Sequence, residues 1–405
     1  MRDGTKATRF ISLKHTTNVE DVRAIATRRL PMAVKDFIEG GAEDEITLRR
    51  NREDFQALSF APKILSSTEE RDQSTTLMGT PVSSPLVLAP VGLAALAHPE
   101  GERAAAIAAA NRGLISTLSA SSCWDLEEVA AAVPDAPRWF QLYVWRDRGI
   151  TREVVERARA AGYRVLALTA DVQVAARRER DLRNGFEIPP RPTLRQGTDV
   201  VRHARWFSRM AWDEVFGHGL RMGNFVKKSR IGTRISMMQQ VNTLFDPQLR
   251  WEDLEWFKEL WGGPVLVKGI TTSADAAEAV RRGADGIWVS NHGGRQLDGL
   301  PSTISVLPEI VDAVGDRADV ILDSGVRRGS DVVKALALGA TAAVIGRPYV
   351  YGLAAGGQAG VERVIDLLKA EIDATLALIG AASIHDLDRS FLRSPTVAWE
   401  TVART

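Results

Sequence analysis

The chain of 405 residues contains a single cysteine, Cys123. A lone cysteine excludes an intramolecular disulfide and every metal site built from several cysteines, and it fits a reducing compartment. No stretch approaches about 18 consecutive apolar residues, so we expect no transmembrane helix. The polar N-terminus MRDGTKATRF lacks the apolar core of a secretory signal, which favours a cytoplasmic protein. With a net charge of only +1, the chain gives no general reason to expect nucleic acid as a partner.

The remaining composition is that of an ordinary soluble globular protein, with 45% hydrophobic and 25% charged residues. We expect a flexible arm over residues 1–20. Helical spacing of apolar residues then predicts a helix over Val19–Phe37, interrupted by Pro31, and a shorter one over Thr47–Phe55. The expected division of the chain is an N-terminal arm and helical segment over residues 1–83, a main domain over 84–380 with an insertion at 172–252, and a tail over 381–405.

From residue 84 onward, short apolar runs alternate with helical segments rich in alanine and glutamate. Each run is the right length for a strand buried on both faces. The alternation predicts a parallel (β/α)8 barrel of the TIM type. A doubly wound open sheet has the same rhythm, but its G-x-G-x-x-G signature is absent. The eight expected strands are Leu86–Pro90, Leu114–Ser119, Trp139–Val144, Val165–Asp171, Val265–Ile270, Ile287–Asn291, Val320–Asp323 and Ala342–Gly346.

The insertion after the fourth strand breaks this rhythm. Its residues 190–235 carry ten basic side chains against three acidic ones, interleaved with apolar residues such as Trp212 and Phe216. A basic amphipathic segment of this kind can lie on an anionic membrane surface, at the inner face of the membrane. The alternative, which we prefer, is a lid or a subunit contact with a solvated basic face.

Barrel enzymes place their chemistry at the carboxyl ends of the strands. Any one polar residue there could be a satisfied core group, but together they predict a ring of functional side chains around one site. After strands seven and eight, Gly325 with Arg327 and Gly346 with Arg347 match the usual phosphate site of such barrels, which implies a phosphorylated cofactor or substrate. The other residues at these ends are Pro90, Val91, Gly92, Ser119, Gln141, Tyr143, Thr169, Asp171, Lys268, Ser290, Asp323 and Ser324.

Three charged or titratable residues differ in kind from the rest. A lysine at the end of a buried strand, Lys268, must meet a negative charge or an acceptor. His292, beside two glycines, suits a general base that Asp171 would orient. Arg295 would form a bidentate pair with a substrate carboxylate. The other five histidines are expected to be ordinary surface or core residues.

Four motifs carry a family resemblance: SNHGGRQLDG at Ser290–Gly299, LVKGI at Leu266–Ile270, DSGVRRGSDVVKALALGA at Asp323–Ala340 and IGRP at Ile345–Pro348. With them the chain resembles the FMN-dependent L-2-hydroxy acid oxidases and dehydrogenases, which include glycolate oxidase, lactate oxidase and dehydrogenase, and mandelate dehydrogenase. The likeness runs from about residue 19 to residue 380. The segment ARRERDLRNGFEIPP, with the insertion that follows it, looks most similar to the mandelate and respiratory lactate dehydrogenases.

This resemblance implies a role for each of these residues at the strand ends. FMN would lie across the barrel mouth, where Lys268 would stabilise negative charge on the reduced flavin ring. His292, paired with Asp171, would take a proton from the substrate. Arg295, Arg178 and Tyr143 would bind the substrate carboxylate or hydroxyl. The ring and ribityl chain of FMN would contact Pro90, Val91, Gly92, Ser119, Gln141, Thr169, Lys268 and Ser290, and the ribityl and phosphate end would contact Asp323, Ser324, Gly325, Arg327, Gly346 and Arg347.

The implied reaction is oxidation of an L-2-hydroxy acid to the 2-keto acid. His292 takes the hydroxyl proton while hydride passes to flavin N5; removal of the α-proton to give a carbanion uses the same residues and stays open. A related FMN oxidase acting on a modified peptide or natural-product intermediate is the alternative function. A barrel that binds FMN or another phosphate ligand as a sensor or scaffold is the non-enzymatic alternative. Oxygen or a quinone would accept the electrons. The resemblance also implies a homotetramer, and no metal is expected.

Two positions depart from the family pattern. Phe37 stands where the family usually has a tyrosine that donates a hydrogen bond to the substrate carboxylate. Losing this bond weakens carboxylate binding by about 1.5–3 kcal/mol. Ser121 stands where glycolate oxidase has a tryptophan over the substrate. Both changes predict an aryl or otherwise bulky 2-hydroxy acid, similar to mandelate or lactate, as the substrate.

Overall fold

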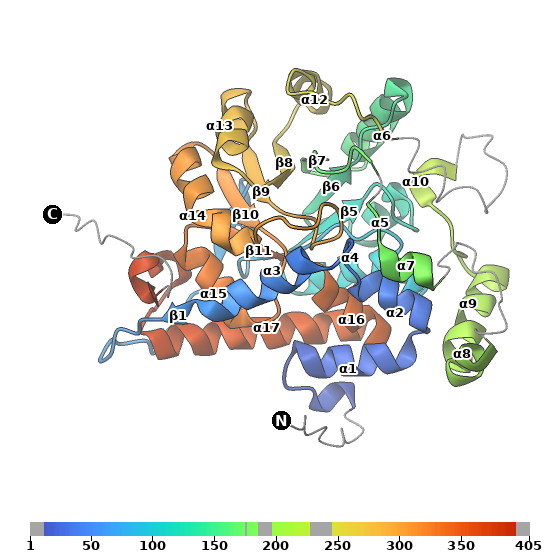
Figure 1. Cartoon of the computed structure of the whole chain (residues 1–405), viewed down its shortest axis with the longest axis horizontal. Helices are drawn as coiled ribbons and strands as arrows, with labels where there is room; N and C mark the ends of the chain where they lie inside the picture. Colours follow the sequence, from blue (N-terminus) through green and yellow to red (C-terminus); the bar gives the residue numbers. More distant parts are fainter. Residues whose placement is uncertain (1–11, 175, 185–196, 227–244, 394–405) are drawn as a thin grey trace.

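The computed structural model describes residues 12–174, 176–184, 197–226 and 245–393. Eight parallel strands form a closed barrel in which consecutive strands pair and the last pairs back to the first (Figure 1). This confirms the predicted (β/α)8 fold. The strands are β4 (Leu86–Leu88), β5 (Ile115–Ser119), β6 (Arg138–Leu142), β7 (Val165–Thr169), β8 (Val265–Ile270), β9 (Gly286–Val289), β10 (Asp319–Leu322) and β11 (Ala342–Ile345).

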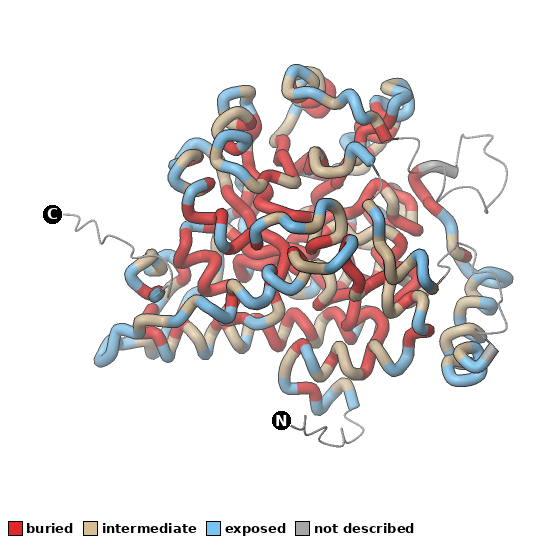
Figure 2. The backbone as a smooth tube through the Cα atoms, viewed as in Figure 1, coloured by how far each residue is buried: buried red, intermediate tan, exposed pale blue. Residues whose placement is uncertain are grey.

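The predicted strands run one or two residues too far at several carboxyl ends. Pro90, Asp171 and Asn291 lie beyond the last paired residue of β4, β7 and β9. Residues there no longer pair with the neighbouring strands, because the chain turns into the loops at the barrel mouth. The strand interiors are buried on both faces, as the red centre of Figure 2 shows.

Helices surround the barrel and bury their apolar sides against it (Figure 1). Two of them, α12 and α16, were not predicted. The sequence of α16 and its surroundings, YGLAAGGQAG, has low helix propensity, and its glycines instead allow close packing: a Cβ at Gly352 would lie 2.5 Å from the carbonyl oxygen of Gly360 on α17. The helices are α4 (Gly101–Asn111), α5 (Leu126–Ala132), α6 (Arg148–Ala160), α12 (Asp253–Trp261), α13 (Ser273–Arg281), α14 (Thr303–Val314), α15 (Gly329–Ala337), α16 (Arg347–Gly356) and α17 (Gln358–Ile379).

Three helices precede the barrel: α1 (Val19–Arg29), α2 (Met32–Glu39) and α3 (Ile46–Ala57). The break before Pro31 falls where the sequence predicts it. The expectation of a flexible arm is wrong for residues 12–18, because Leu13–His15 form a 3-10 turn and Thr16 is buried. Arg363 of α17 holds this segment by donating hydrogen bonds to the carbonyl and hydroxyl oxygens of Thr16.

Two small antiparallel sheets lie outside the barrel. The hairpin of β2 (Thr75–Leu77) and β3 (Thr80–Val82) contacts the amino ends of the barrel strands, since Met78 donates its N–H to Asp319 at the start of β10. The strand β1 (Ser59–Phe60) pairs with β12 (Leu392–Arg393) in the predicted C-terminal tail. Strands of two or three residues are too short for the sequence to show a period, and none of these four was predicted.

The described part of the insertion contains α7 (Glu179–Arg183), α8 (Gly197–Arg202), α9 (Ala204–Phe216) and α10 (Gly223–Val226). Helices α8 and α9 stand at the edge of the molecule, away from the barrel strands (Figure 1). Much of the predicted basic segment, residues 190–196 and 227–235, lies outside the described residues. None of the described helices is long and apolar enough to cross a membrane.

Candidate active site

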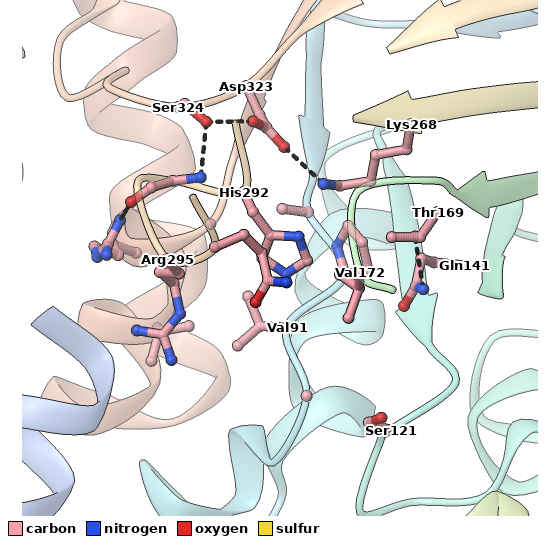
Figure 3. A pocket seen from close by; sticks show the side chains of 18 of the residues that line it. Val91, Ser121, Gln141, Thr169, Val172, Lys268, His292, Arg295, Asp323 and Ser324 are labelled. Carbon is pink, nitrogen blue, oxygen red and sulfur yellow. Dashed lines mark hydrogen bonds and ion pairs between the residues drawn. The ribbon is translucent and has the colours of Figure 1, made fainter. Parts of the chain in front are cut away.

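One cavity at the carboxyl ends of the barrel strands collects nearly all the residues singled out in the sequence (Figure 3). Three of them, Ser119, Asp171 and Ser290, lie behind the cavity wall and make hydrogen bonds to residues that line it. The predicted residues that line the cavity are Phe37, Pro90, Val91, Gly92, Ser121, Gln141, Tyr143, Thr169, Arg178, Lys268, His292, Arg295, Asp323, Ser324, Gly325, Arg327, Gly346 and Arg347.

His292 lies at the centre of this view, between Val91 and Val172 (Figure 3). Its Nδ1 is 3.0 Å from one carboxylate oxygen of Asp171 and 3.1 Å from the other. Its backbone adopts a positive φ of 58°, and its N–H donates to the hydroxyl of Ser290 at 3.1 Å. The loop after β9 therefore presents the imidazole to the cavity with one nitrogen already held by a carboxylate.

The electrostatics favour a neutral imidazole beside a charged carboxylate. Burial lowers the pKa of His292, and the nearby Lys268 charge lowers it further, although Asp171 opposes both. Burial alone would raise the pKa of Asp171, but the interaction with His292 and the charge of Lys268 outweigh it and hold that pKa below its ordinary value. A neutral histidine with a hydrogen-bonded carboxylate is the arrangement that a general base requires.

Lys268, at the end of β8, is buried and paired. Its Nζ donates to the hydroxyl of Ser290 at 2.8 Å and lies 3.7 Å from a carboxylate oxygen of Asp323. Burial would lower the pKa of Lys268, but Asp323 and Asp171 raise it above its ordinary value, so the side chain is a cation. The negative partner that the sequence predicts for this lysine is therefore Asp323, another of the side chains at the strand ends.

A chain of side-chain hydrogen bonds crosses the ends of three neighbouring strands, β5, β6 and β7. Ser119 donates to the amide oxygen of Gln141 at 3.0 Å, and the Gln141 amide nitrogen donates to Thr169 at 2.8 Å. Ser119 also accepts the N–H of Ser121 at 3.1 Å. These bonds fix the orientation of the Gln141 amide beside the cavity.

Three partly buried arginines line the same cavity. Arg295 donates to the carbonyls of Phe37 and Gly40, Arg347 donates to three carbonyls from two segments, and Arg327 donates to the carbonyl of Val326. Burial lowers the pKa of all three, that of Arg347 to about 10. Within the described ranges none of them pairs with a carboxylate. Partly buried cations without an anionic partner are costly, so the cavity is suited to anionic ligands.

Several lining residues were not predicted. Met222 and Phe245 come from the insertion, and the Phe245 ring lies 4.8 Å from that of Tyr143. No local pattern marks them, since single apolar residues in an irregular segment give no periodic signal. Gln296 could have been found, because it lies within SNHGGRQLDG; its amide donates to the carbonyls of Asp171 and Val174.

Comparison with known proteins agrees with this geometry. The family described as FMN-dependent dehydrogenase matches residues 26–394. The chain belongs to this family. It is 43% identical over 378 residues to an L-lactate oxidase of Nostoc sp., covering 93% of the chain and 97% of the relative. It is 42% identical over 376 residues to glycolate oxidase 1 of Oryza sativa, covering 93% and 95%.

Solved structures give the same answer. A structure described as the monotopic membrane protein (S)-mandelate dehydrogenase matches with a TM-score of 0.89 and 41% identity over 94% of this chain and 99% of the other. A mandelate oxidase matches with a TM-score of 0.79 and 35% identity, covering 93% and 98%. The protein is an FMN-dependent oxidoreductase of the 2-hydroxy acid oxidase and dehydrogenase family, and the predicted cofactor is confirmed. The alternative natural-product substrate finds no support among these relatives.

Proposed function

We propose that the protein oxidises an L-2-hydroxy acid with a bulky, mandelate-like side chain, and that His292 is its catalytic base. The observation that carries this proposal is the His292–Asp171 pair, whose imidazole lines one cavity together with the guanidinium of Arg295. The base and a cation suited to a carboxylate both come from the loop after β9.

The residues of the ring fit FMN. Arg327 and Arg347, with Gly325 and Gly346, would bind the phosphate, because the arginines line the cavity as partly buried cations without a carboxylate partner in the described part of the chain. Lys268 would hold negative charge at the ring, and Gln141 with Thr169 would donate hydrogen bonds to it; the further contacts are those that the resemblance implies. When bound, FMN accepts the two electrons that leave the substrate.

The substrate carboxylate would bind Arg295, with Arg178 and Tyr143 as further donors. Because Asp171 accepts from His292 Nδ1, the Nε2 atom of the ring is the one that takes the proton. Asp171 then stabilises the imidazolium that results. The same geometry serves removal of the hydroxyl proton or of the α-proton.

An apolar wall supports a bulky substrate. Val172, Met222 and Phe245 line the cavity beside Tyr143, and the small Ser121 leaves space among them. Apolar and aromatic surface of this kind stabilises an aryl side chain by removing it from water. L-Mandelate should therefore be preferred to glycolate.

An anaerobic titration tests the proposal. L-Mandelate should bleach the flavin of the holoenzyme, and glycolate should do so more slowly. The His292→Ala variant should keep its FMN but lose flavin reduction by roughly 10²- to 10⁴-fold. Normal reduction by this variant would refute the assignment of the base, and glycolate as the best substrate would refute the substrate class.

We also propose that α9 contacts an anionic membrane surface and that a quinone there accepts the electrons. Trp212, Val215 and Phe216 share one face of α9 and are about 70% exposed, and Arg205 and Arg209 lie on the same helix. The protein should cosediment with phosphatidylglycerol vesicles, and Trp212→Ser with Phe216→Ser should abolish this. The control is Leu378→Ser, an equally exposed residue on α17. Fast turnover with oxygen and no vesicle binding would contradict both parts.

A further inference from the structure

The loop that follows β9, residues 290–300, is here called the catalytic loop because it carries His292 and Arg295. It packs on α3, a helix that belongs to the N-terminal segment rather than to the barrel. Asp298 accepts the N–H groups of Ile46 at 3.1 Å and Thr47 at 2.8 Å, the first two residues of α3. The loop therefore supplies the cap of this helix.

The main chains approach equally closely at a second point. Ala42, just before α3, donates its N–H to the carbonyl of Gly294 at 2.8 Å. A Cβ at Gly294 would lie 2.7 Å from the backbone nitrogen of Leu48 in the first turn of α3. Only glycine fits there, and its φ of 71° is also one that glycine adopts readily.

A reciprocal pair of buried amides joins the middle of α3 to the catalytic loop. Asn51 donates to the side-chain oxygen of Asn291 at 2.8 Å, and Asn291 donates back to that of Asn51 at 2.7 Å. Both side chains are about 2% exposed. Hydrogen bonds away from water are strong, and leaving either amide unpaired there would be costly.

The Asn291 amide cannot turn over to suit a different partner. Its oxygen also accepts the N–H of Gly294 at 3.2 Å, and its nitrogen also donates to the carbonyl of Pro301 at 3.1 Å. Gly294 belongs to the catalytic loop and Pro301 directly follows it, and both partners are main-chain groups. The residue at position 51 must therefore offer a donor and an acceptor together, as asparagine does and aspartate does not.

His292 directly follows Asn291 and has a positive φ, which is uncommon for a residue with a side chain. Such a conformation persists only where the surroundings fix it. We propose that Asn51 is a positioning residue for His292: through Asn291 it holds the catalytic loop in the conformation that presents the imidazole to the substrate. This inference rests on the proposed function, in which His292 is the base.

The test measures anaerobic flavin reduction in the holoenzyme, at saturating concentration of whichever of L-lactate and L-mandelate reduces the wild type faster. Asn51→Asp keeps the size of the side chain but removes the donor. Its reduction rate constant should fall by on the order of 10- to 100-fold with flavin content unchanged. If this variant loses its flavin, Asn51→Ser takes its place with the same expectation. The control is Asn18→Ala, which removes a cap from α1 and should leave the rate unchanged.

A second measurement separates positioning through Asn291 from a general effect on α3. Asn51→Ala should slow reduction, and adding it to Asn291→Ala should cause no further loss, because the pair is already broken in Asn291→Ala. Losses that multiply in the double variant, or a wild-type rate in Asn51→Asp, would overturn the inference. His292→Ala measured alongside distinguishes the two proposals: if it reduces flavin normally, the base assignment itself is wrong.

Discussion

Arg295 donates a hydrogen bond of 2.6 Å to the main-chain oxygen of Phe37, and its guanidinium carbon lies 5.1 Å from the centre of the Phe37 ring. The residue that departs from the family pattern thus orients the arginine with its backbone and covers it with an aromatic face. A phenyl ring contributes a cation–π contact but no hydroxyl donor. The proposed carboxylate site therefore depends on arginine more than the sequence pattern alone implies.

Restoring a hydroxyl at this position should tighten substrate binding. Phe37 lines the cavity, so the added oxygen of Phe37→Tyr would reach the space beside Arg295. A hydrogen bond to a charged group is worth about 1.5–3 kcal/mol, so KM for L-mandelate or L-lactate should fall by roughly tenfold or more. Steady-state kinetics check this, with Phe37→Leu as a control that lacks both ring and hydroxyl. An unchanged KM would show that the carboxylate does not bind there.

The activity should depend on pH through His292. The base must be neutral, so kcat/KM should rise with pH through the pKa of His292, which burial lowers below its ordinary value of 6.5. In Asp171→Asn the carboxylate that raises this pKa is gone. The rising part of the kcat/KM pH profile should then move to still lower pH, and kcat/KM itself should fall by roughly 10²- to 10⁴-fold. A rising part that moves to higher pH would contradict the pairing of these two side chains.

Ser121 should control the size of the substrate. It lines the cavity next to Gly92, and a tryptophan there would fill the space proposed for an aryl group. Ser121→Trp should raise KM for L-mandelate by about tenfold or more while leaving glycolate turnover largely intact. Ser121→Ala is the control, since it keeps the space. If Ser121→Trp and Ser121→Ala have the same relative activity on L-mandelate and glycolate, the side chain of the substrate binds elsewhere in the cavity.

Replacing Arg327 should weaken FMN binding but stabilise the FMN-free protein. Its guanidinium is partly buried and donates only to the carbonyl of Val326 among the described residues. Arg327→Met should weaken FMN binding by roughly 10- to 100-fold through loss of a charge-assisted bond to phosphate. It should also raise the melting temperature of the FMN-free protein, because a partly buried cation without a carboxylate partner is removed. Riboflavin, which lacks the phosphate, should bind wild type and variant equally.

The fold and most of the candidate site could be predicted because both depend on local signals. Lys268 and His292 stand next to apolar runs, and barrel topology brings all strand ends to one mouth. Met222 and Phe245 were not predicted, because single apolar residues in an irregular segment give no periodic signal. The Asn51–Asn291 pair was not predicted, although Asn291 lies within SNHGGRQLDG, because a motif does not show which distant residue its members contact. The homotetramer stays a prediction, to be checked by the mass of the protein in solution.

The last feature concerns the small sheet outside the barrel, in which Ser59 and Phe60 pair with Arg393 and Leu392. Nearly the whole chain lies between these partners, so the sheet cannot form until residue 393 has been synthesised. The barrel has the same property, because its first strand, β4, pairs with its last, β11. During translation the apolar strands of the emerging chain are therefore without their final neighbours. The barrel closes only when the last strands and helices have been added. A ribosome that stops early would release a chain with an open, exposed sheet edge, so truncated products of this protein should aggregate rather than fold.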